Sequence, residues 1–375
     1  MGKGEITVEE LEAKIQSGKV ELLLDMRNPD EFESWRIEGR HEIETMNIPH
    51  TDLVGEEEKY LDRLPVDREI IVVCAHGDAS AYSAAELRKL GLNARGLVGG
   101  MEAWSFLYET TRVVDDPLVI QLYRLAKGCI THLVISDGEA VVIDAVRHIE
   151  KIKQLLADHN ATLKYVFDTH LQADHISGGR QLAADAGCDY CISPVDAAGA
   201  AYSHKILADG ETFAVGKSKL RVLHTPGHTP GSTSFVLDEK YMFTGDAIMK
   251  SALGRPDLGG KVREWADLLF DTIHQRFRRI DDRTIVLPTH ASSVMERDAA
   301  GAVSLTLGEA RRKMELFSIR DRQQFADLIE KTLLENPARY QDIRMVNLGQ
   351  SDPDEEKRKE LETGKNLCGM AEKKG

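Results

Sequence analysis

The sequence predicts two successive domains of mixed α/β structure, and two observations carry this prediction. The chain has 375 residues, a length that fits about two cores of roughly 100–200 residues each. Strand and helix signals alternate over residues 5–112, whereas strand signals come in runs from residue 118 onwards. Alternation predicts a parallel sheet covered by helices, and runs of strands predict two packed sheets flanked by helices.

The first part begins with a predicted helix at 8–18 and an apolar strand at 20–26. The run EIIVVC at 69–74 predicts another strand, and AYSAAELRKLG at 81–91 predicts a helix that ends at its glycine. Repetition of strand followed by helix is typical of parallel sheets.

The second part follows a short charged segment, 113–117, that is the predicted linker. Residues 129–146 then predict two strands joined by the two-residue turn Asp137-Gly138. The tail, 351–375, is mostly charged and is expected to be loosely held. Between them we expect helices near 147–158, 263–277, 304–316 and 321–335, and strands at 163–169, 219–225, 232–237, 241–247 and 284–290.

Composition excludes several classes of protein. The net charge is −14, so a basic surface for nucleic acid or anionic lipid is not expected. No apolar stretch is long enough to cross a bilayer, and the N-terminus does not resemble a secretory signal. Cysteines are few, odd in number and scattered, which indicates a reducing compartment and predicts a cytoplasmic protein. They are Cys74, Cys129, Cys188, Cys191 and Cys368. The oligomeric state is left open, and a homo-oligomer is one alternative.

Groups that can bind a metal ion occur in four segments of the second part. The segments are THLQADH (169–175), TPGHTPGS (225–232), FTGDA (243–247) and LPTH (287–290). Each lies where a predicted strand gives way to a loop, so a rigid scaffold can bring the side chains into one cleft. The candidate ligands are His170, Asp174, His175, His228, Asp246 and His290. The alternative is six unrelated groups that cap helices or face solvent.

The order HxHxDH, TPGHTPG, TGD and a late histidine resembles the metallo-β-lactamase superfamily over about 118–350, which implies an α+β domain with an αββα sandwich. The sequence departs from this pattern at Gln172, where a second histidine is expected. In the two-zinc hydrolases of the superfamily, such as glyoxalase II, that histidine is a zinc ligand, and an amide is a poorer ligand.

The persulfide dioxygenases of the same superfamily hold a single iron by the first histidine, the TPGH histidine and the TGD aspartate. These groups are present here as His170, His228 and Asp246. The resemblance implies one Fe(II) per chain with open positions, and oxidation of a thiol persulfide, for example glutathione persulfide, with O2 to sulfite and free thiol. The carrier thiol stays open.

The resemblance also implies roles for neighbouring residues. Gln172, Asp174, His175 and His290 would orient the ligands or, for the last three, form a second metal site with Asp246. The runs 243–260, 335–347 and 366–370 are similar to the same family. Within the first run, Arg255 is expected either to contact an anionic thiol substrate or to form a structural ion pair with Asp257.

Cys74 ends the predicted strand 69–74 and precedes a short glycine-containing loop and a helix. Backbone amides and the positive end of a helix stabilise an anionic sulfur at such a position. With LLLDMRNPDEFE, the run through NIP and GLVGGMEAW, this loop resembles the rhodanese sulfurtransferases over most of 5–110. The resemblance implies a rhodanese-like α/β domain with Cys74 as sulfur carrier.

That loop departs from C-x-x-G-x-R-S because Ala79 stands where arginine is expected. We therefore expect impaired turnover of thiosulfate, and an inactive structural rhodanese is the alternative. Cys188 and Cys191 are expected to pack as small apolar residues, and Cys129 to be an ordinary core residue.

These observations predict a rhodanese-like domain over 1–112 and a metallo-β-lactamase-fold dioxygenase over 118–350. The first hypothesis is an iron dioxygenase of sulfide oxidation. The second is a two-zinc thioester hydrolase of glyoxalase II type, and the third is a sulfur-binding module without catalysis, suggested by Ala79 together with Gln172.

Overall fold

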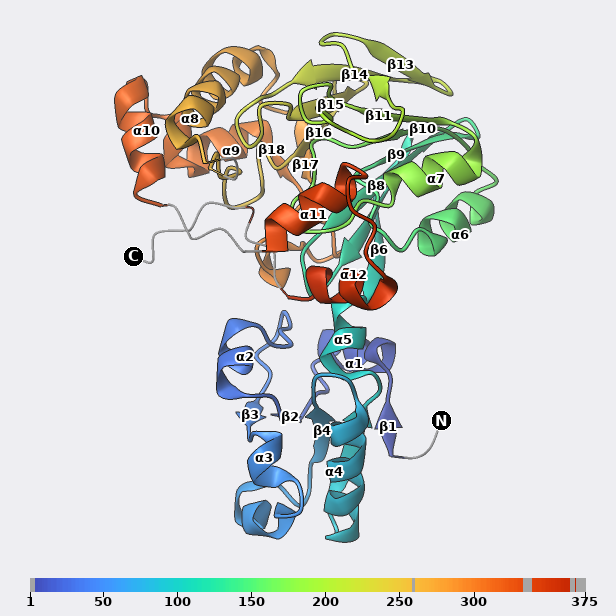
Figure 1. The fold of residues 1–375 in the computed structure, drawn as a ribbon, viewed down its shortest axis with the longest axis vertical. Helices are drawn as coiled ribbons and strands as arrows, with labels where there is room; N and C mark the ends of the chain where they lie inside the picture. Colours follow the sequence, from blue (N-terminus) through green and yellow to red (C-terminus); the bar gives the residue numbers. More distant parts are fainter. Residues whose placement is uncertain (1–3, 258–259, 333–338, 365–367, 369–375) are drawn as a thin grey trace. The chain divides into compact units, whose positions relative to one another are not determined.

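The computed structural model describes residues 4–257, 260–332, 339–364 and 368, and the chain forms two compact units (Figure 1). Most of the first unit lies before Glu109, and Arg124–Lys127 also belongs to it. The second unit contains Glu109–Tyr123 and most of the chain from Gly128 onwards. Parts of the segments discussed above lie outside the described residues, namely 258–259, 333–338, 365–367 and 369–375.

The first unit is built on a five-stranded sheet in the order β1-β5-β4-β2-β3, in which every paired strand is parallel. Its strands are β1 (Glu5–Ile6), β2 (Leu22–Asp25), β3 (Thr45–Asn47), β4 (Glu69–Val73) and β5 (Asn93–Leu97). Its helices are α1 (Val8–Gln16), α2 (Pro29–Ser34), α3 (His50–Leu53), α4 (Asp78–Lys89) and α5 (Gly100–Ser105), with a 3-10 turn at Glu57–Arg63. The predicted α/β architecture is confirmed.

Local features of the sequence explain why these elements form where they do. Every side chain of β2 is buried, which suits the continuous apolar run of a strand covered on both faces. Helix α1 begins where expected because Thr7 and Glu10 form a reciprocal capping box. Residues of α4 such as Ala84 and Leu87 pack on the buried strands and complete the core.

The second unit contains a seven-stranded sheet, β12-β11-β10-β9-β8-β7-β6, and a six-stranded sheet, β13-β14-β15-β16-β17-β18. The first sheet comprises β6 (Tyr108–Asp115), β7 (Leu118–Arg124), β8 (Ile130–Ser136), β9 (Glu139–Ile143), β10 (Thr162–Phe167), β11 (Asp189–Ile192) and β12 (Lys205–Ile206). The second comprises β13 (Thr212–Val215), β14 (Ser218–His224), β15 (Thr233–Leu237), β16 (Tyr241–Gly245), β17 (Ile285–Pro288) and β18 (Leu305–Thr306). One apolar core joins them, with Val141 of the first sheet and Phe235 of the second as members.

Helices cover the outer faces of both sheets (Figure 1). On the first sheet lie α6 (Glu150–Asp158) and α7 (Gly179–Ala186); on the second lie α8 (Val262–Asp271), α9 (Leu307–Lys313) and α10 (Arg322–Glu330). Two further helices, α11 (Arg339–Asn347) and α12 (Glu355–Glu362), follow. The predicted αββα sandwich is confirmed.

The predicted hairpin at Asp137-Gly138 is present between β8 and β9, where Ser136 pairs with Glu139. Both turn residues have positive φ, 50° and 77°, as a turn of type I′ requires. None of the helices described is both long enough and apolar enough to span a lipid bilayer.

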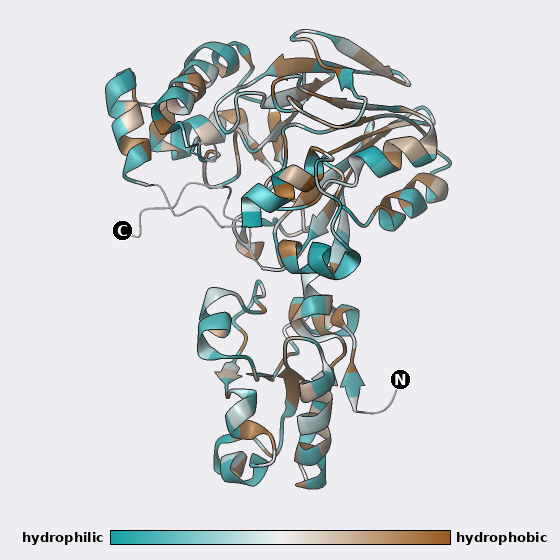
Figure 2. Cartoon of the chain, viewed as in Figure 1, coloured by the Kyte–Doolittle hydropathy of each residue, from teal (hydrophilic) through white to brown (hydrophobic). Residues whose placement is uncertain are grey.

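Three segments differ from the sequence-based expectation. Residues 113–117, the expected linker, form the end of β6 and the turn into β7. Only one side chain of β6 is buried, so its apolar pattern is weak. The helix expected at 263–277 leaves α-helical geometry after Asp271 and continues as a π-helical turn, Thr272–Arg276. Part of the expected loose tail is α12, which Figure 2 draws as hydrophilic along most of its length and which therefore lacks an apolar pattern.

Candidate metal centre

The candidate ligands lie at the ends of strands from both sheets of the second unit. His170 follows β10, His228 lies in the loop between β14 and β15, and Asp246 comes directly after β16. His290 lies just beyond β17, the parallel neighbour of β16. The two sheets therefore bring these residues together although they are far apart in the sequence.

Three buried polar atoms converge without a hydrogen-bond partner among the described residues: Nε2 of His170, Nε2 of His228 and Oδ2 of Asp246. The carboxylate oxygen lies 3.8 Å from the first nitrogen and 3.5 Å from the second. Each side chain is at most 2% exposed. Buried polar groups without partners are costly, and two imidazole nitrogens with one carboxylate oxygen form a donor set for a divalent transition metal. The arrangement fits a metal ion.

Each of these side chains is anchored through its other polar atom. Nδ1 of His170 lies 2.9 Å from Oγ1 of Thr169, and Nδ1 of His228 lies 3.0 Å from the carbonyl oxygen of Arg255. Oδ1 of Asp246 lies 2.6 Å from Nδ1 of His290. These contacts direct the three free atoms toward one point, as outer partners of metal ligands commonly do.

Burial keeps both imidazoles in the form that binds metal. It lowers the pKa of His170 to about 3 and also lowers the pKa of His228. Burial alone would raise the pKa of Asp246, but the nearby His290 lowers it overall. Two neutral imidazoles and one carboxylate are therefore available.

Asp144 connects the loop that carries His170 to the end of β17. Its carboxylate accepts hydrogen bonds from the backbone N and Oγ1 of Thr169, from Oγ1 of Thr289 at 2.5 Å and from Nε2 of Gln172 at 3.1 Å. Burial, followed by the charge of Asp168, raises the pKa of Asp144 to about 7. Gln172 thus acts in this network through its amide nitrogen.

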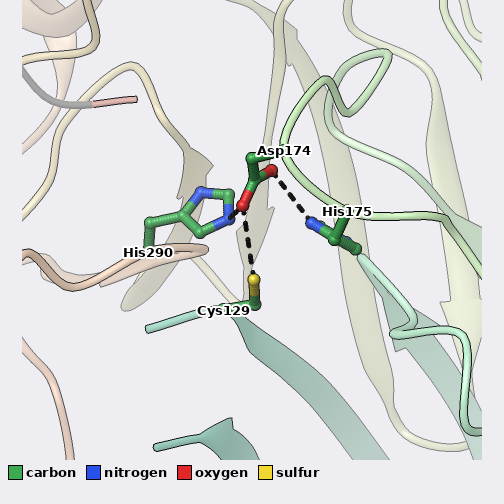
Figure 3. Close-up of side chains that lie close together, drawn as sticks. All are labelled: Cys129, Asp174, His175 and His290. Carbon is green, nitrogen blue, oxygen red and sulfur yellow. Dashed lines mark hydrogen bonds and ion pairs between the residues drawn. The ribbon is translucent and has the colours of Figure 1, made fainter. Parts of the chain in front are cut away.

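A second cluster of four fully buried residues lies beside the first: Cys129, Asp174, His175 and His290 (Figure 3). Oδ2 of Asp174 lies 3.1 Å from Nε2 of His290 and accepts a 3.4 Å hydrogen bond from the thiol of Cys129. Oδ1 of Asp174 lies 3.0 Å from Nδ1 of His175. Cys129 is buried in the core as expected, but its thiol also takes part in this polar cluster, which the sequence did not indicate.

The charges of this cluster favour protonated imidazoles. Burial opposes a charge on His175, but Cys129 and Asp174 raise its pKa to about 10. Burial likewise opposes a charge on His290, yet Asp174 and Asp246 raise its pKa well above the usual value. A metal ion in this cluster would have to displace those protons, whereas the site at His170 needs no such displacement.

Cys368 is a third potential ligand that sequence reasoning left without a role. Its sulfur and ligand atoms of Asp246 and His290 all lie within 4.8 Å of one another. Its carbonyl oxygen accepts a hydrogen bond from the backbone N of Arg255. Burial raises the pKa of the thiol well above the ordinary value.

Arg255 is buried, 1% exposed, and forms an ion pair with Asp257. Nε and Nη2 donate to the two carboxylate oxygens at 2.7 and 2.6 Å. Of the two expectations for this residue, the structural ion pair is the one observed. Its carbonyl oxygen also anchors His228.

Two C-terminal helices hold the loop that carries His170 and His175, a contribution that the sequence did not indicate. The side-chain amide of Asn347 in α11 donates to the carbonyl oxygens of Gln172 and His175, each at 2.9 Å, and accepts from the backbone N of Ser177. Glu362 of α12 accepts from the backbone N of Ile176 and pairs with Arg147. These contacts tie the loop to α11 and α12.

In the first unit, backbone amides surround the sulfur of Cys74. The N–H groups of Gly77 and Ser80 donate to Sγ at 3.1 and 3.3 Å. Gly77 has a φ of 102°, and a Cβ there would lie 2.6 Å from the backbone N of Gly99, so only glycine fits. Ala79 lies in the first turn of α4 and packs against the core. The loop is a backbone cradle for sulfur.

Each unit matches a known protein family. Residues 7–106 match the model of the rhodanese-like domain, and residues 128–290 match that of the metallo-beta-lactamase superfamily. The chain is similar to the mitochondrial persulfide dioxygenase ETHE1 of Bos taurus, with 31% identity over 180 residues, 46% of this chain and 68% of the relative.

Two solved structures are similar to the chain. A metallo-beta-lactamase from Staphylococcus aureus has a TM-score of 0.56 and 27% identity, covering 61% of this chain and 71% of that one. ETHE1 from Myxococcus xanthus has a TM-score of 0.51 and 26% identity, covering 64% of this chain and 100% of that one. These likenesses agree with a metal-binding second unit.

Proposed function

The chain belongs to the metallo-beta-lactamase superfamily, among the relatives of the persulfide dioxygenase ETHE1, and we propose that it is an iron-dependent persulfide dioxygenase with its own rhodanese-like sulfurtransferase domain. The reaction consumes one O2 and one water per thiol persulfide and yields sulfite and the free thiol. The proposed substrate is a small persulfide such as glutathione persulfide, and the modules are 1–112 and 118–350.

The observation that carries this proposal is the convergence of three partnerless atoms from His170, His228 and Asp246. Gln172 stands where a further imidazole would bind zinc, and its amide nitrogen is used by Asp144. Three protein ligands leave open positions on an octahedral ferrous ion.

A ferrous ion at this site would supply the redox chemistry with O2. The chain's own residues fix its position: two neutral imidazoles donate through Nε2, and Asp246 stays ionised because His290 lies against its other oxygen. The site is buried, which limits access of water to the reacting groups.

For the first unit we propose that Cys74 carries sulfane sulfur as a persulfide. The amides of Gly77 and Ser80 would stabilise its negative charge. With Ala79 in place of arginine, a small thiol persulfide suits this loop better than thiosulfate. The five free cysteines support a reducing compartment such as the cytoplasm.

The direct test is an oxygen electrode with the iron-loaded full chain and glutathione persulfide. We expect O2 uptake that starts only when the persulfide is added, with one sulfite formed per O2. Glutathione alone and a His228→Gln variant serve as controls. Absence of uptake by iron-loaded protein would overturn the proposal.

A second candidate is a two-zinc thioester hydrolase, which the cluster of Cys129, Asp174, His175 and His290 favours because it offers further ligands. This candidate predicts acid release from S-lactoylglutathione without O2. If neither reaction occurs and no metal binds, the chain is a sulfur-binding module.

A further inference from the structure

A pocket of about 640 Å³ lies in the second unit between the π-helical turn after α8 and the segment that follows α9. The residues that line it include His274, Arg278, Arg311 and Arg320, with Ile273 and Phe317 as apolar members. None of the metal-cluster residues is among them. Its volume lies within the range of small-molecule sites, about 300–1,000 Å³.

The described residues that line this pocket include three arginines and no aspartate or glutamate. The chain as a whole carries a net charge of −14, so this concentration of positive charge runs against the composition. Guanidinium groups present paired N–H donors that match the oxygens of phosphate, sulfonate and carboxylate.

Two of the three guanidinium groups form no ion pair with the residues that the structure describes. Arg311 pairs with Asp282. Arg320 instead donates to Nδ1 of His274 at 2.7 Å, and burial lowers the pKa of this imidazole, so it is a neutral acceptor. Arg278 is exposed and, within the described part of the chain, makes no hydrogen bond or ion pair. An anionic ligand would therefore meet two available charges.

One wall of the pocket is formed by a π-helical turn, which is a rare backbone conformation. His274 lies in the π-helical turn Thr272–Arg276, and such turns occur frequently at functional sites. Oγ1 of Thr272 donates to the carbonyl oxygen of Pro226 at 2.6 Å, two residues before His228. An occupant of the pocket would contact the same turn that supports the His228 loop.

From this combination we propose that the pocket binds an organic oxyanion. Arg278 and Arg320 hold its phosphate or sulfonate group, and Ile273 with Phe317 contacts its apolar part. The volume exceeds the need of a bare tetrahedral ion, and the apolar side chains give the rest of the molecule a surface to bury.

Calorimetric titration of the metal-loaded full chain tests this proposal. The probes are phenyl phosphate, benzenesulfonate and inorganic phosphate. We expect one of the two organic anions to bind more tightly than inorganic phosphate, and the preferred one identifies the anionic group. In the double variant Arg278→Gln with Arg320→Gln, its affinity should fall roughly tenfold or more, because two charge-assisted contacts are lost.

The matched control is Arg283→Gln, an exposed arginine that pairs with Asp281 outside the pocket; it should bind like the unaltered chain. The single variant Arg278→Gln removes an exposed side chain and separates loss of binding from misfolding. Undiminished binding by the double variant, or no binding of any probe, would overturn the proposal. Equal affinity for inorganic and organic anions would overturn the apolar half of it.

Discussion

The sulfur of Cys74 receives two hydrogen bonds from backbone amides within its own loop, both less than seven residues away. The candidate metal centre takes its three donor atoms from three separate loops on two sheets. A backbone cradle needs only the right turn, because every residue supplies an amide. A side-chain site needs the whole sandwich, because its donors come from loops far apart in the sequence and two of them, His228 and Asp246, are aimed by distant partners.

This difference predicts that each centre can be destroyed without the other, and His228→Ala should have the largest effect. The variant removes one of three donors, so metal content and O2 uptake should fall to the level of metal-free protein. Sulfur loading of Cys74, followed by mass spectrometry with a persulfide donor, should be unchanged.

The converse variant, Cys74→Ser, should lose sulfur loading and keep O2 uptake with added glutathione persulfide. Loss of both activities in either single variant would show that the two centres depend on each other, which would contradict this prediction.

The next largest difference between the two units should be the loss of stability at low pH. His132 of β8 is fully buried, and burial lowers its pKa to about 3, whereas the unfolded value is about 6.5. The unfolded chain therefore binds an extra proton between these pH values. The contribution of His132 to the second unit's free energy of unfolding should be fully present above about pH 6.5. It should fall as the pH decreases, by up to ~1.4 kcal/mol per pH unit.

The histidines of the first unit, His41, His50 and His76, are all exposed, so its stability should change less over this range. Hydrogen exchange measured between pH 7 and 5 distinguishes the units. A His132→Gln variant with the same acid sensitivity as the unaltered chain would contradict the assignment.

Asn347→Ala tests whether remote side chains aim the metal ligands. Loss of its amide leaves the carbonyl oxygens of Gln172 and His175 without their donor and loosens the loop after His170. We expect metal affinity to fall ~10–100-fold. The control is Gln350→Ala, whose amide contacts the carbonyl of Gly199 on the surface; equal effects of both substitutions would refute a positioning role for Asn347.

Ser80→Ala should have the smallest effect. Alanine keeps the backbone N–H that donates to the sulfur of Cys74 and loses only the 3.4 Å contact between that sulfur and the hydroxyl. We expect the rate of sulfur loading to change by no more than ~3-fold, in line with the modest net value of one neutral hydrogen bond. A loss as large as that of Cys74→Ser would show that the hydroxyl carries the chemistry.

The same difference between local and distant contacts limits what the sequence can predict. The Cys74 loop and the motifs that contain His170, His228 and Asp246 are contiguous patterns, and both domain folds were predicted from them. The roles of Cys129, Asn347 and Cys368 arise from contacts between residues far apart in the chain, which no local pattern contains. The sequence does not predict helix α12, because its many charged residues give no apolar periodicity. Its Glu362 nevertheless accepts a hydrogen bond from Ile176, in the loop that carries His170 and His175.

We propose that His170, His228 and Asp246 hold a single metal ion, and that His290 of the neighbouring cluster orients Asp246 through its second carboxylate oxygen. Anaerobic titration of the metal-free full chain with Fe(II) tests it directly. One equivalent should bind to the unaltered chain and to a His175→Gln variant, and none should bind tightly to His228→Gln. Two equivalents in the unaltered chain, reduced to one by His175→Gln, would show that the neighbouring cluster is a second metal site and would overturn the single-metal proposal.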